Sequence, residues 1–368
     1  MAYRAIEPAD LMRAVSDLRY MPKMLEYITG VEPSPIYDEV FSKDRKMEKT
    51  TRYFDQSSTK TISVVTYRGV EGTFEPINSK VITAASFEPK AIKVMKSYTP
   101  TFLDELGRVQ MKTATEVFRE DYVDFMLTRD ANIKNQCAQF FAGTGGTINF
   151  PERNADGTIV TGDSINYQTY FGTITALTVA DTSYVVNWGT STTTQDDVWN
   201  SVKQLIKYGR VQSSYKHFKK VSDIIIFAQD AAFAYLHTMS PNEYMEKVLT
   251  QDGFDYKIGN GTNTVRIINT NMPYQTWTYD ATTDKKWELT SADALASGEI
   301  VVLDNAKGNF KIRDLKYLTT SNAGKDIPFP YSITTEKLPH ETGIELAFGC
   351  YPLVIGNPLA MFKAKVIS

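Results

Sequence analysis

The strongest pattern of apolar positions lies between residues 114 and 142, where apolar side chains recur three or four positions apart. That spacing is typical of one face of a helix. Thr113 followed by Glu116 has the sequence of a capping box, and Gly143 is placed to end the helix. We therefore predict one helix over 114–142, roughly 40 Å long at about 1.5 Å per residue. The apolar stripe consists of Phe118, Tyr122, Phe125, Met126, Ile133, Cys137, Phe140 and Phe141.

A period of two, typical of a β-strand, precedes this helix. In TISVVTYRGVEGTF (61–74), Ile62 and Val64 alternate with Val65 and Tyr67, and glycines supply turns before KVITAASFEPKAIKV (80–94) returns. The pattern predicts a β-hairpin over 61–95. Neither face of its first strand is strongly apolar, and an isolated hairpin is only marginally stable in water. We therefore expect this hairpin to need a partner surface.

Residues 1–60 mix helical and turn signals. Apolar spacing favours a short amphipathic helix over 8–18, and three prolines between positions 22 and 35 interrupt regular structure after it. Acidic and basic residues are equally common here. We interpret the segment as an extended arm with little core of its own.

Two segments flank the long helix. Before it, Thr99 and Pro100 favour a short helix through Leu106, with Gly107 as its break. After it, the stretch from Gly143 to Thr194 is rich in threonine and carries short β runs between turn signals. We predict an irregular β region there.

Residues 195–345 have the pattern of an α/β module. Asp196 or Asp197 can cap a helix that ends at Gly209, and SDIIIFA (222–228) is typical of a buried strand. Further predicted elements are helices in QDAAFAYLHTM and in NEYMEKVLTQ, the second capped by Ser240 and Pro241 and closed by Gly253, strands in TVRIIN, YQTWTYD and EIVVLDN, and return strands from Gly343 to the C-terminus.

Composition places the chain among folded proteins. Its 368 residues are 42 % hydrophobic and 23 % charged, which excludes wholesale disorder and allows a substantial core in one or two domains. Cys137 and Cys350 cannot form a disulfide framework and suit a reducing cytoplasm. We find no signal peptide at the N-terminus and predict no membrane span, because the apolar stretch 346–362 is broken by glycines and prolines.

Charge and chemistry give few candidates. The net charge of −3 argues against a dedicated nucleic-acid binder. The basic and aromatic cluster YKHFKK (215–220) fits nucleic-acid binding, but we interpret it as a solvated charged loop. GTGG (143–146) and GNGT (259–262) are interpreted as turns, and the only histidines are His217, His237 and His340. We nominate no catalytic, cofactor-binding or metal-binding residue.

The order of elements resembles the major capsid proteins of tailed phages, specifically the lambda-type E family with the Hong-Kong-97-type capsid fold. The resemblance covers most of the chain from about Pro33 onward, although the stretch 150–195 matches poorly. The segments that carry it are YRGVEGTFEPINSKVITAASFEPKAIKV (67–94), AQFFAGTGGTINF (138–150), SDIIIFAQDAAFAYLHTM (222–239), EIVVLDNAKGNFKIRDLKY (299–317) and CYPLVIGNPLAMFKAKVIS (350–368).

The resemblance implies an α+β fold with a domain map. Its expected parts are an N-terminal arm over 1–60, an extended β-hairpin loop over 61–97, a peripheral domain with the long spine helix and a Thr-rich β insertion over 98–195, an α/β axial domain over 196–343, and C-terminal return strands of the peripheral domain over 344–368. The candidate inter-subunit contacts are Tyr67, Arg68, Phe74, Pro76 and Phe87.

The resemblance also implies a function. It points to a structural protein that is not an enzyme, needs no cofactor, and assembles in the host cytoplasm as hexamers and pentamers of an icosahedral virion shell around double-stranded DNA, without sequence-specific binding. Implied partners are portal and scaffolding proteins and in some members a decoration protein. One alternative is an encapsulin-like compartment shell. A remote alternative is an enzyme or ligand-binding module built on 195–345.

Overall fold

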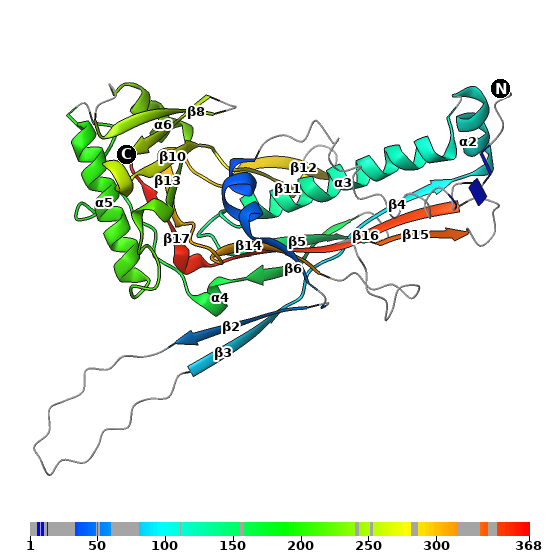
Figure 1. The fold of residues 1–368 in the computed structure, drawn as a ribbon, viewed down its shortest axis with the longest axis horizontal. Coiled ribbons are helices and arrows are strands. Elements are labelled where there is room, and N and C mark those ends of the chain that lie inside the picture. The colour runs from blue at the N-terminus through cyan, green and yellow to red at the C-terminus, as the bar shows by residue number, and fades with distance from the viewer. Residues whose placement is uncertain are drawn as a thin grey trace, which may run out of the picture.

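The protein is elongated and has an α+β architecture, with two main sheets joined end to end and one long helix that lies along the five-stranded sheet (Figure 1). The structure is a computed structural model that describes residues 6, 7, 9, 10, 13, 34–48, 50, 52–59, 81–110, 112–154, 158–190, 192–239, 243–250, 253–280, 286–315, 332–337 and 344–368. The predicted helix over 8–18 and the first predicted hairpin strand over 61–74 lie largely or wholly outside these residues. In the described part, no helix is both long and apolar enough to cross a membrane.

The long helix is present as predicted. It is α3 (Ala114–Gln139), and Thr113 closes the expected capping box: its hydroxyl accepts the Glu116 N–H at 3.3 Å, and the Glu116 carboxylate accepts the Thr113 N–H at 2.8 Å. Phe140 is the C-cap, so the helix ends three residues earlier than predicted. The whole predicted stripe is buried, although its last two residues, Phe140 and Phe141, follow the end of α3.

The five-stranded sheet is built on one long strand, β16. The first half of β16 pairs with β15 on one side and β4 on the other, and its second half pairs with β14. The helix α3 packs on this sheet, with Phe125 stacked 4.8 Å from Phe348 between ring centroids. The strands are β1 (Arg45–Met47), β14 (Phe310–Leu315), β16 (Ile344–Gly356), β15 (Ser332–Lys337) and β4 (Ile92–Tyr98).

The six-stranded sheet lies at the other end of the molecule and is mixed parallel and antiparallel (Figure 1). Its central strand β7 is buried along its whole length, as expected for the IIIFA run. In sheet order the strands are β17 (Met361–Lys365), β13 (Glu299–Asp304), β7 (Ile224–Ala228), β10 (Val265–Asn269), β9 (Gly253–Ile258) and β8 (Met245–Thr250). The helices of this end are α5 (Gln195–Gln212) and α6 (Asp230–His237).

Two local expectations in this region are wrong. The segment NEYMEKVLTQ contains the strand β8 and not a helix, because Met245–Thr250 pairs along its length with β9. The helix α5 is capped by Thr194, whose hydroxyl accepts the Asp197 N–H, and it runs through Gly209. Gly209 is needed for packing there: a Cβ would lie 2.9 Å from the rings of Phe218 and Phe362.

For three strands, sheet membership does not follow the residue ranges of the domain map. β14 and β15, both within 196–343, belong to the five-stranded sheet, and β17, within 344–368, pairs with β13 of the six-stranded sheet. A single buried cluster, which includes Phe140, Phe227 and Phe310, spans both sheets. The chain therefore crosses the junction more than once, and the two sheets share a core.

Shorter elements complete the described fold. The helix α2 (Pro100–Asp104) is capped by Thr99 as predicted, but a π-helical turn, η4 (Glu105–Val109), continues through Gly107. The Thr-rich stretch forms the hairpin β5 (Thr147–Arg153) and β6 (Ile159–Asn166), then α4 (Gln168–Phe171) and an irregular segment, in line with the predicted irregular β region. Two further hairpins are β2 (Tyr53–Thr59) with β3 (Val81–Phe87), and β11 (Pro273–Asp280) with β12 (Lys286–Asp293).

Residues 34–48 form a strap that lies across the junction of the two sheets. The strap contains the π-helical turn η2 (Tyr37–Phe41), the 3₁₀ turn η3 (Ser42–Asp44) and β1, which pairs in parallel with β14. Ile36, Val40 and Phe41 are buried in the shared core. This part of the expected arm therefore has a place in the chain's own core, because its apolar side chains fill the junction.

Candidate functional site

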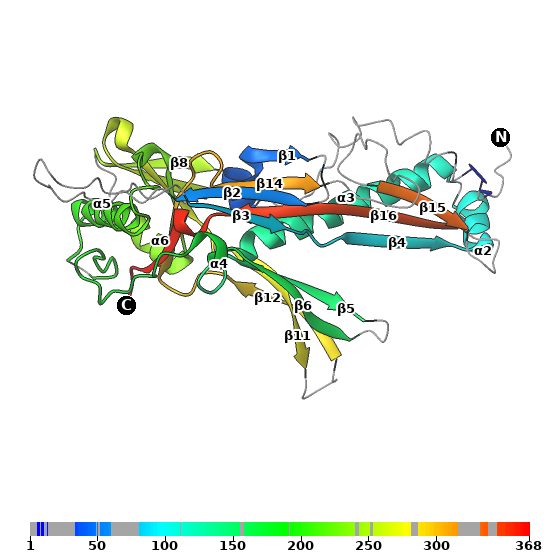
Figure 2. The same ribbon diagram turned by 90° about the horizontal axis from the view of Figure 1, so that it is seen from below.

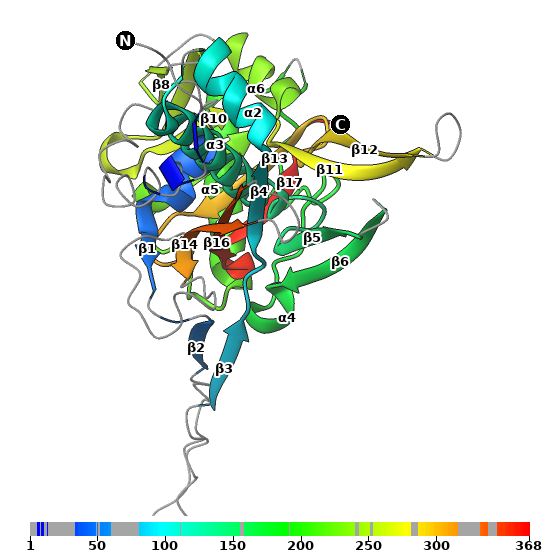
Figure 3. The same cartoon turned by 90° about the vertical axis from the view of Figure 1, so that its right-hand side faces the viewer.

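The hairpin β2–β3 is the part of the molecule that stands clear of the body (Figures 1 and 3). Its two strands pair antiparallel from Tyr53 opposite Phe87 at the base to Thr59 opposite Val81. Beyond the base, the ribbon runs away from both sheets in each view (Figures 1 and 3). A two-stranded ribbon has one layer and cannot enclose a core, so this hairpin presents surfaces to whatever lies beside the molecule.

The base of the hairpin is anchored by aromatic packing. Phe87 is 8 % exposed and its ring centroid lies 5.0 Å from that of Tyr167 and 5.6 Å from that of Tyr170. Its partner Tyr53 packs against the shared core, with the Lys311 ammonium 4.9 Å from its ring centroid. The residue pair at the base of the hairpin, Tyr53 and Phe87, is therefore fixed to the body by both of its side chains.

Charged groups brace the same base. The Lys90 ammonium, just after β3, contacts the carboxylates of Asp163 and Glu152 on β5–β6. The hydrogen bond with Asp163 raises the pKa of Lys90. Arg52 and Glu88 pair across the start of the hairpin at 3.0 Å. These groups are largely exposed to solvent, so each pair contributes at most about 1 kcal/mol to stability.

The structure places one of the five predicted contact residues. Tyr67, Arg68, Phe74 and Pro76 lie between β2 and β3, outside the described residues, and their role in contacts between subunits stays a prediction. Phe87 lies in the chain's own core, where it anchors the hairpin. Tyr53, the other anchor, was not among the residues predicted from the sequence. The signal was available, since Tyr53 and Phe54 are apolar positions just before a polar run.

The histidines were the other side chains considered for chemistry, and the one whose side chain is described, His217, packs against groups of the fold. His217 lies with its Nδ1 3.8 Å from an Asp304 carboxylate oxygen and its Nε2 3.1 Å from the Asn357 side-chain nitrogen. Burial lowers the pKa of His217, although the Asp304 charge opposes this. Asp304 itself accepts the Phe218 N–H at 2.8 Å. The His237 side chain and His340 are outside the described residues.

The glycine-rich segments form turns, as predicted. Gly143, Gly145 and Gly146 all have positive φ, and the Gly146 N–H donates to the Phe140 carbonyl to close the end of α3. GNGT lies in the turn before β10. Cys137 and Cys350 are buried and free, and burial raises the pKa of both thiols. Among the described residues, no three His, Cys, Asp or Glu side chains are grouped to hold a metal ion.

Comparisons with known proteins give matches in structure only. No family model matches the chain, and no curated protein matches its sequence. Similar solved structures are the capsid of a native GTA particle (10 % identity, TM-score 0.47, 93 % of this chain and 94 % of that chain), a protein assigned as the capsid protein of a prophage of E. coli CFT073 (10 %, 0.46, 99 % and 99 %), and the capsid of Myoviridae phage XM1 (11 %, 0.44, 94 % and 97 %). At this level of similarity, the chain's own geometry carries the functional assignment.

Proposed function

We propose that this chain is a major capsid protein of a tailed phage, a structural subunit and not an enzyme. In this proposal many copies assemble in the host cytoplasm into hexamers and pentamers of a closed icosahedral shell, the virion head, which encloses double-stranded DNA. The lambda-type E family and the Hong-Kong-97-type fold are the specific assignments that the sequence resemblance suggests. Portal, scaffolding and decoration proteins are the proposed partners.

The observation that carries the proposal is the contrast between the hairpin β2–β3 and the rest of the molecule. The body buries its apolar side chains in a core that spans both sheets. The hairpin is held at its base by the packing of Tyr53 and Phe87 and by exposed ion pairs, and it leads away from that core (Figure 3). Such a projection is stable in an assembly in which copies cover each other's projections, and closed symmetry is the economical way to achieve this.

The experiment compares the full chain with a variant that lacks residues 68–80. Each is purified and its mass is measured by size-exclusion chromatography with light scattering, and its particles are imaged by negative-stain microscopy. We expect rings or closed shells from the full chain, and a folded monomer from the variant, since residues 68–80 lie beyond the described strands of the hairpin. Co-expression with neighbouring genes is included, because a separate scaffold can be required.

A matched control removes the exposed Arg52–Glu88 pair with Arg52→Gln, which leaves the hairpin in place. We expect that variant to assemble. A full chain that stays monomeric or dimeric in every condition contradicts the proposal. Normal shells from the deletion variant would show that the hairpin is not an assembly element. Circular dichroism of the deletion variant separates failed assembly from failed folding.

A further inference from the structure

The segment from Lys203 to Lys220 concentrates positive charge in a chain whose net charge is −3. It contains no aspartate or glutamate, and it follows the exposed side of α5 into the loop 213–220. We call its exposed lysines the basic strip. The basic strip consists of Lys203, Lys207, Lys216, Lys219 and Lys220.

The lysines of the basic strip are exposed and are not neutralised by ion pairs with other described residues. Within the described part of the chain, none of the five makes a salt bridge, whereas Arg45, Arg266 and Arg313 each bind carboxylates. The Lys203 ammonium lies 5.0 Å from the Trp199 ring centroid. A run of exposed, unneutralised cations repels itself, so it is stabilised by an anionic partner.

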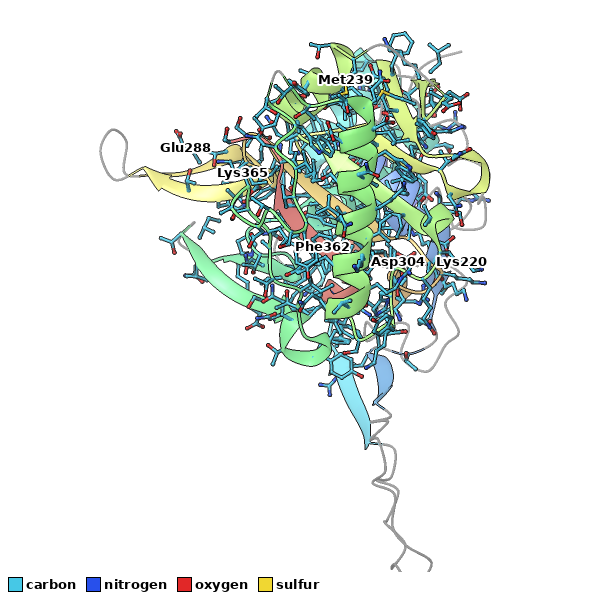
Figure 4. All side chains as sticks on the ribbon, turned by 90° about the vertical axis from the view of Figure 1, so that its left-hand side faces the viewer. Lys220, Met239, Glu288, Asp304, Phe362 and Lys365 are labelled. Atoms are coloured by element: carbon cyan, nitrogen blue, oxygen red, sulfur yellow. The ribbon has the colours of Figure 1, made fainter. Side chains whose placement is uncertain are left out.

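Two carboxylates that adjoin the loop of the basic strip have hydrogen-bond partners within the protein. Asp304 is buried and accepts the N–H groups of Phe218 and Ala306. Asp223, which follows the basic strip, is half-buried and accepts the Ser222 hydroxyl. Figure 4 looks onto α5 and shows Lys220 and Asp304 near one end of that helix. The positive charge of the basic strip is therefore left for an external group.

The loop that carries three of these lysines is held in an unfavourable backbone conformation. Ser214, Tyr215 and Phe218 have φ values of 52°, 60° and 59°, in the left-handed region that residues with a side chain rarely adopt. The strain leaves Tyr215 64 % exposed while Phe218 is fully buried. Strained loops that hold exposed side chains outward occur preferentially at binding sites.

Specific contacts hold the strained loop in place. The Arg210 guanidinium donates to the carbonyls of Phe218 and Lys219 at 3.0 and 3.3 Å. The Asp304 carboxylate holds the Phe218 N–H at 2.8 Å, and Ser213 accepts the His217 N–H at 3.2 Å. The loop is thus preorganised, and its lysines lie on a fixed framework and not on a free tail.

We propose that the basic strip binds the phosphate backbone of double-stranded DNA without reading its sequence. Lysines act as point charges toward phosphate, and a row of them with no base-reading side chains fits backbone contacts. The net charge of −3 is compatible with this, because binding follows the local distribution of charge and not the sum. The proposal rests on the proposed function, in which the chain lies against enclosed DNA.

The test measures binding of a fluorescent mixed-sequence DNA duplex of about 20 base pairs to the unassembled full chain as a function of salt. Each phosphate contact contributes about 0.9 to the slope of log affinity against log salt, so five lysines predict a slope of about −4 to −5. We expect the variant Lys216→Gln/Lys219→Gln/Lys220→Gln to bind at least about tenfold more weakly at low salt and to lower the slope by about 3.

The control Lys93→Gln/Lys247→Gln/Lys365→Gln removes the same charge from exposed lysines elsewhere, and Lys365 lies away from Lys220 in Figure 4. We expect this control to bind DNA as the unaltered chain does. If both triple variants lose affinity equally, binding is non-specific attraction and the proposal is wrong. A second variant, Lys203→Gln/Lys207→Gln, changes only the helix and keeps the test valid if the loop variant misfolds.

Two further outcomes separate this proposal from others. A polyglutamate peptide of similar charge is the competitor. If the peptide displaces the DNA as well as free duplex does, the basic strip recognises acidic protein surfaces and the DNA assignment is overturned.

Self-association of the loop variant is the second readout. If that variant binds DNA normally but loses self-association, the partner of the basic strip is another copy of this chain, and the DNA assignment is again overturned. Because DNA binding is measured before assembly, failure to form shells would contradict the proposed function and leave this result intact.

Discussion

The strap and the hairpin β2–β3 are consecutive along the chain and have opposite relations to the body. The strap buries Phe41 completely in the shared core, and its ring contacts Phe140 and Phe310 at 6.0 and 5.5 Å between centroids. The hairpin contributes Tyr53 and Phe87, at its base, to that core, and Figure 2 shows β2 and β3 side by side as a separate two-stranded ribbon. From the sequence, both segments were expected to contribute little to the core of their own chain. The difference shows that a few large apolar side chains with a place in the core decide whether a segment belongs to its own chain.

Ion pairs reinforce the same contrast. Arg45 in the strap donates to both carboxylate oxygens of Asp314 at 2.7 and 3.0 Å, and Arg313 donates to the Asp44 carbonyl at 2.7 Å. Glu39 contacts Arg266 of the six-stranded sheet. The strap is therefore tied to one sheet through Asp314 and to the other through Arg266, while the pairs at the hairpin base are exposed.

The largest expected effect comes from removing the apolar anchor of the strap. We expect Phe41→Ala to lower the free energy of unfolding by about 3–5 kcal/mol, because it leaves a cavity among Phe140, Phe141 and Phe310. Chemical denaturation followed by circular dichroism measures this. The control Phe102→Ala removes a ring that is 37 % exposed and is expected to cost clearly less. Equal costs would mean that the strap is not part of the core.

The next effect concerns the buried ion pair of the strap. Asp314→Ala leaves the Arg45 guanidinium, which is 21 % exposed, without its carboxylate, and we expect the free energy of unfolding to fall by about 3 kcal/mol. Glu88→Ala removes the exposed partner of Arg52 at the hairpin base, with an expected cost below about 1 kcal/mol. Denaturation curves that give the two variants equal stability would contradict the contrast between strap and hairpin.

A smaller effect depends on pH. Burial alone would raise the pKa of Glu39, but hydrogen bonds and charges from Arg266 and Lys43 outweigh it and leave that pKa lowered. A carboxylate with a lowered folded-state pKa stabilises the protein above its unfolded pKa and loses that contribution as the pH falls. We expect Glu39→Gln to cost about 1 kcal/mol at pH 7.

The difference between Glu39→Gln and the unaltered chain should then shrink as the pH falls below about 4. Denaturation at several pH values tests this. Lys43→Gln, which removes only the exposed partner of Glu39, is the control and should show a smaller difference at every pH. A difference that grows on acidification would show that Glu39 is destabilising in its charged form.

The sequence predicted those elements whose pattern is decided locally. Thr113 and Glu116 are three residues apart, so the start of α3 could be read directly. The secondary structure of Met245–Thr250 could not be predicted in this way, because its apolar positions at 245, 248 and 249 fit a helix as well as a strand. Pairing with β9 decides between them. β-structure depends on partners that a single segment does not reveal.

The candidate sites show the same limit. The return strand of the predicted hairpin contains β3, but the strand paired with it is Tyr53–Thr59, which the sequence placed in the arm. The anchoring at Tyr53 and Phe87 depends on Tyr167 and Lys311, which are distant in sequence. Three of the five lysines of the basic strip were visible in the sequence as YKHFKK. Its strained backbone was not, because the group that holds Phe218 is Asp304, 86 residues away. The positive charge of the loop 213–220 could be predicted from the sequence. Its fixed backbone conformation could not, because that depends on contacts made only in the folded chain.

The smallest expected effect lies at the exposed brace of the hairpin. Lys90→Gln removes the contacts with Asp163 and Glu152, and we expect the free energy of unfolding to change by less than about 1 kcal/mol, because solvent screens exposed pairs. Denaturation of this variant beside Asp314→Ala measures the ratio of the two effects. The packing of the core should be unchanged in this variant, since Phe87 stays in contact with Tyr167 and Tyr170. A loss as large as that of Asp314→Ala would mean that the hairpin is held to the body by its charges, as the strap is, and the contrast between the two regions would fail.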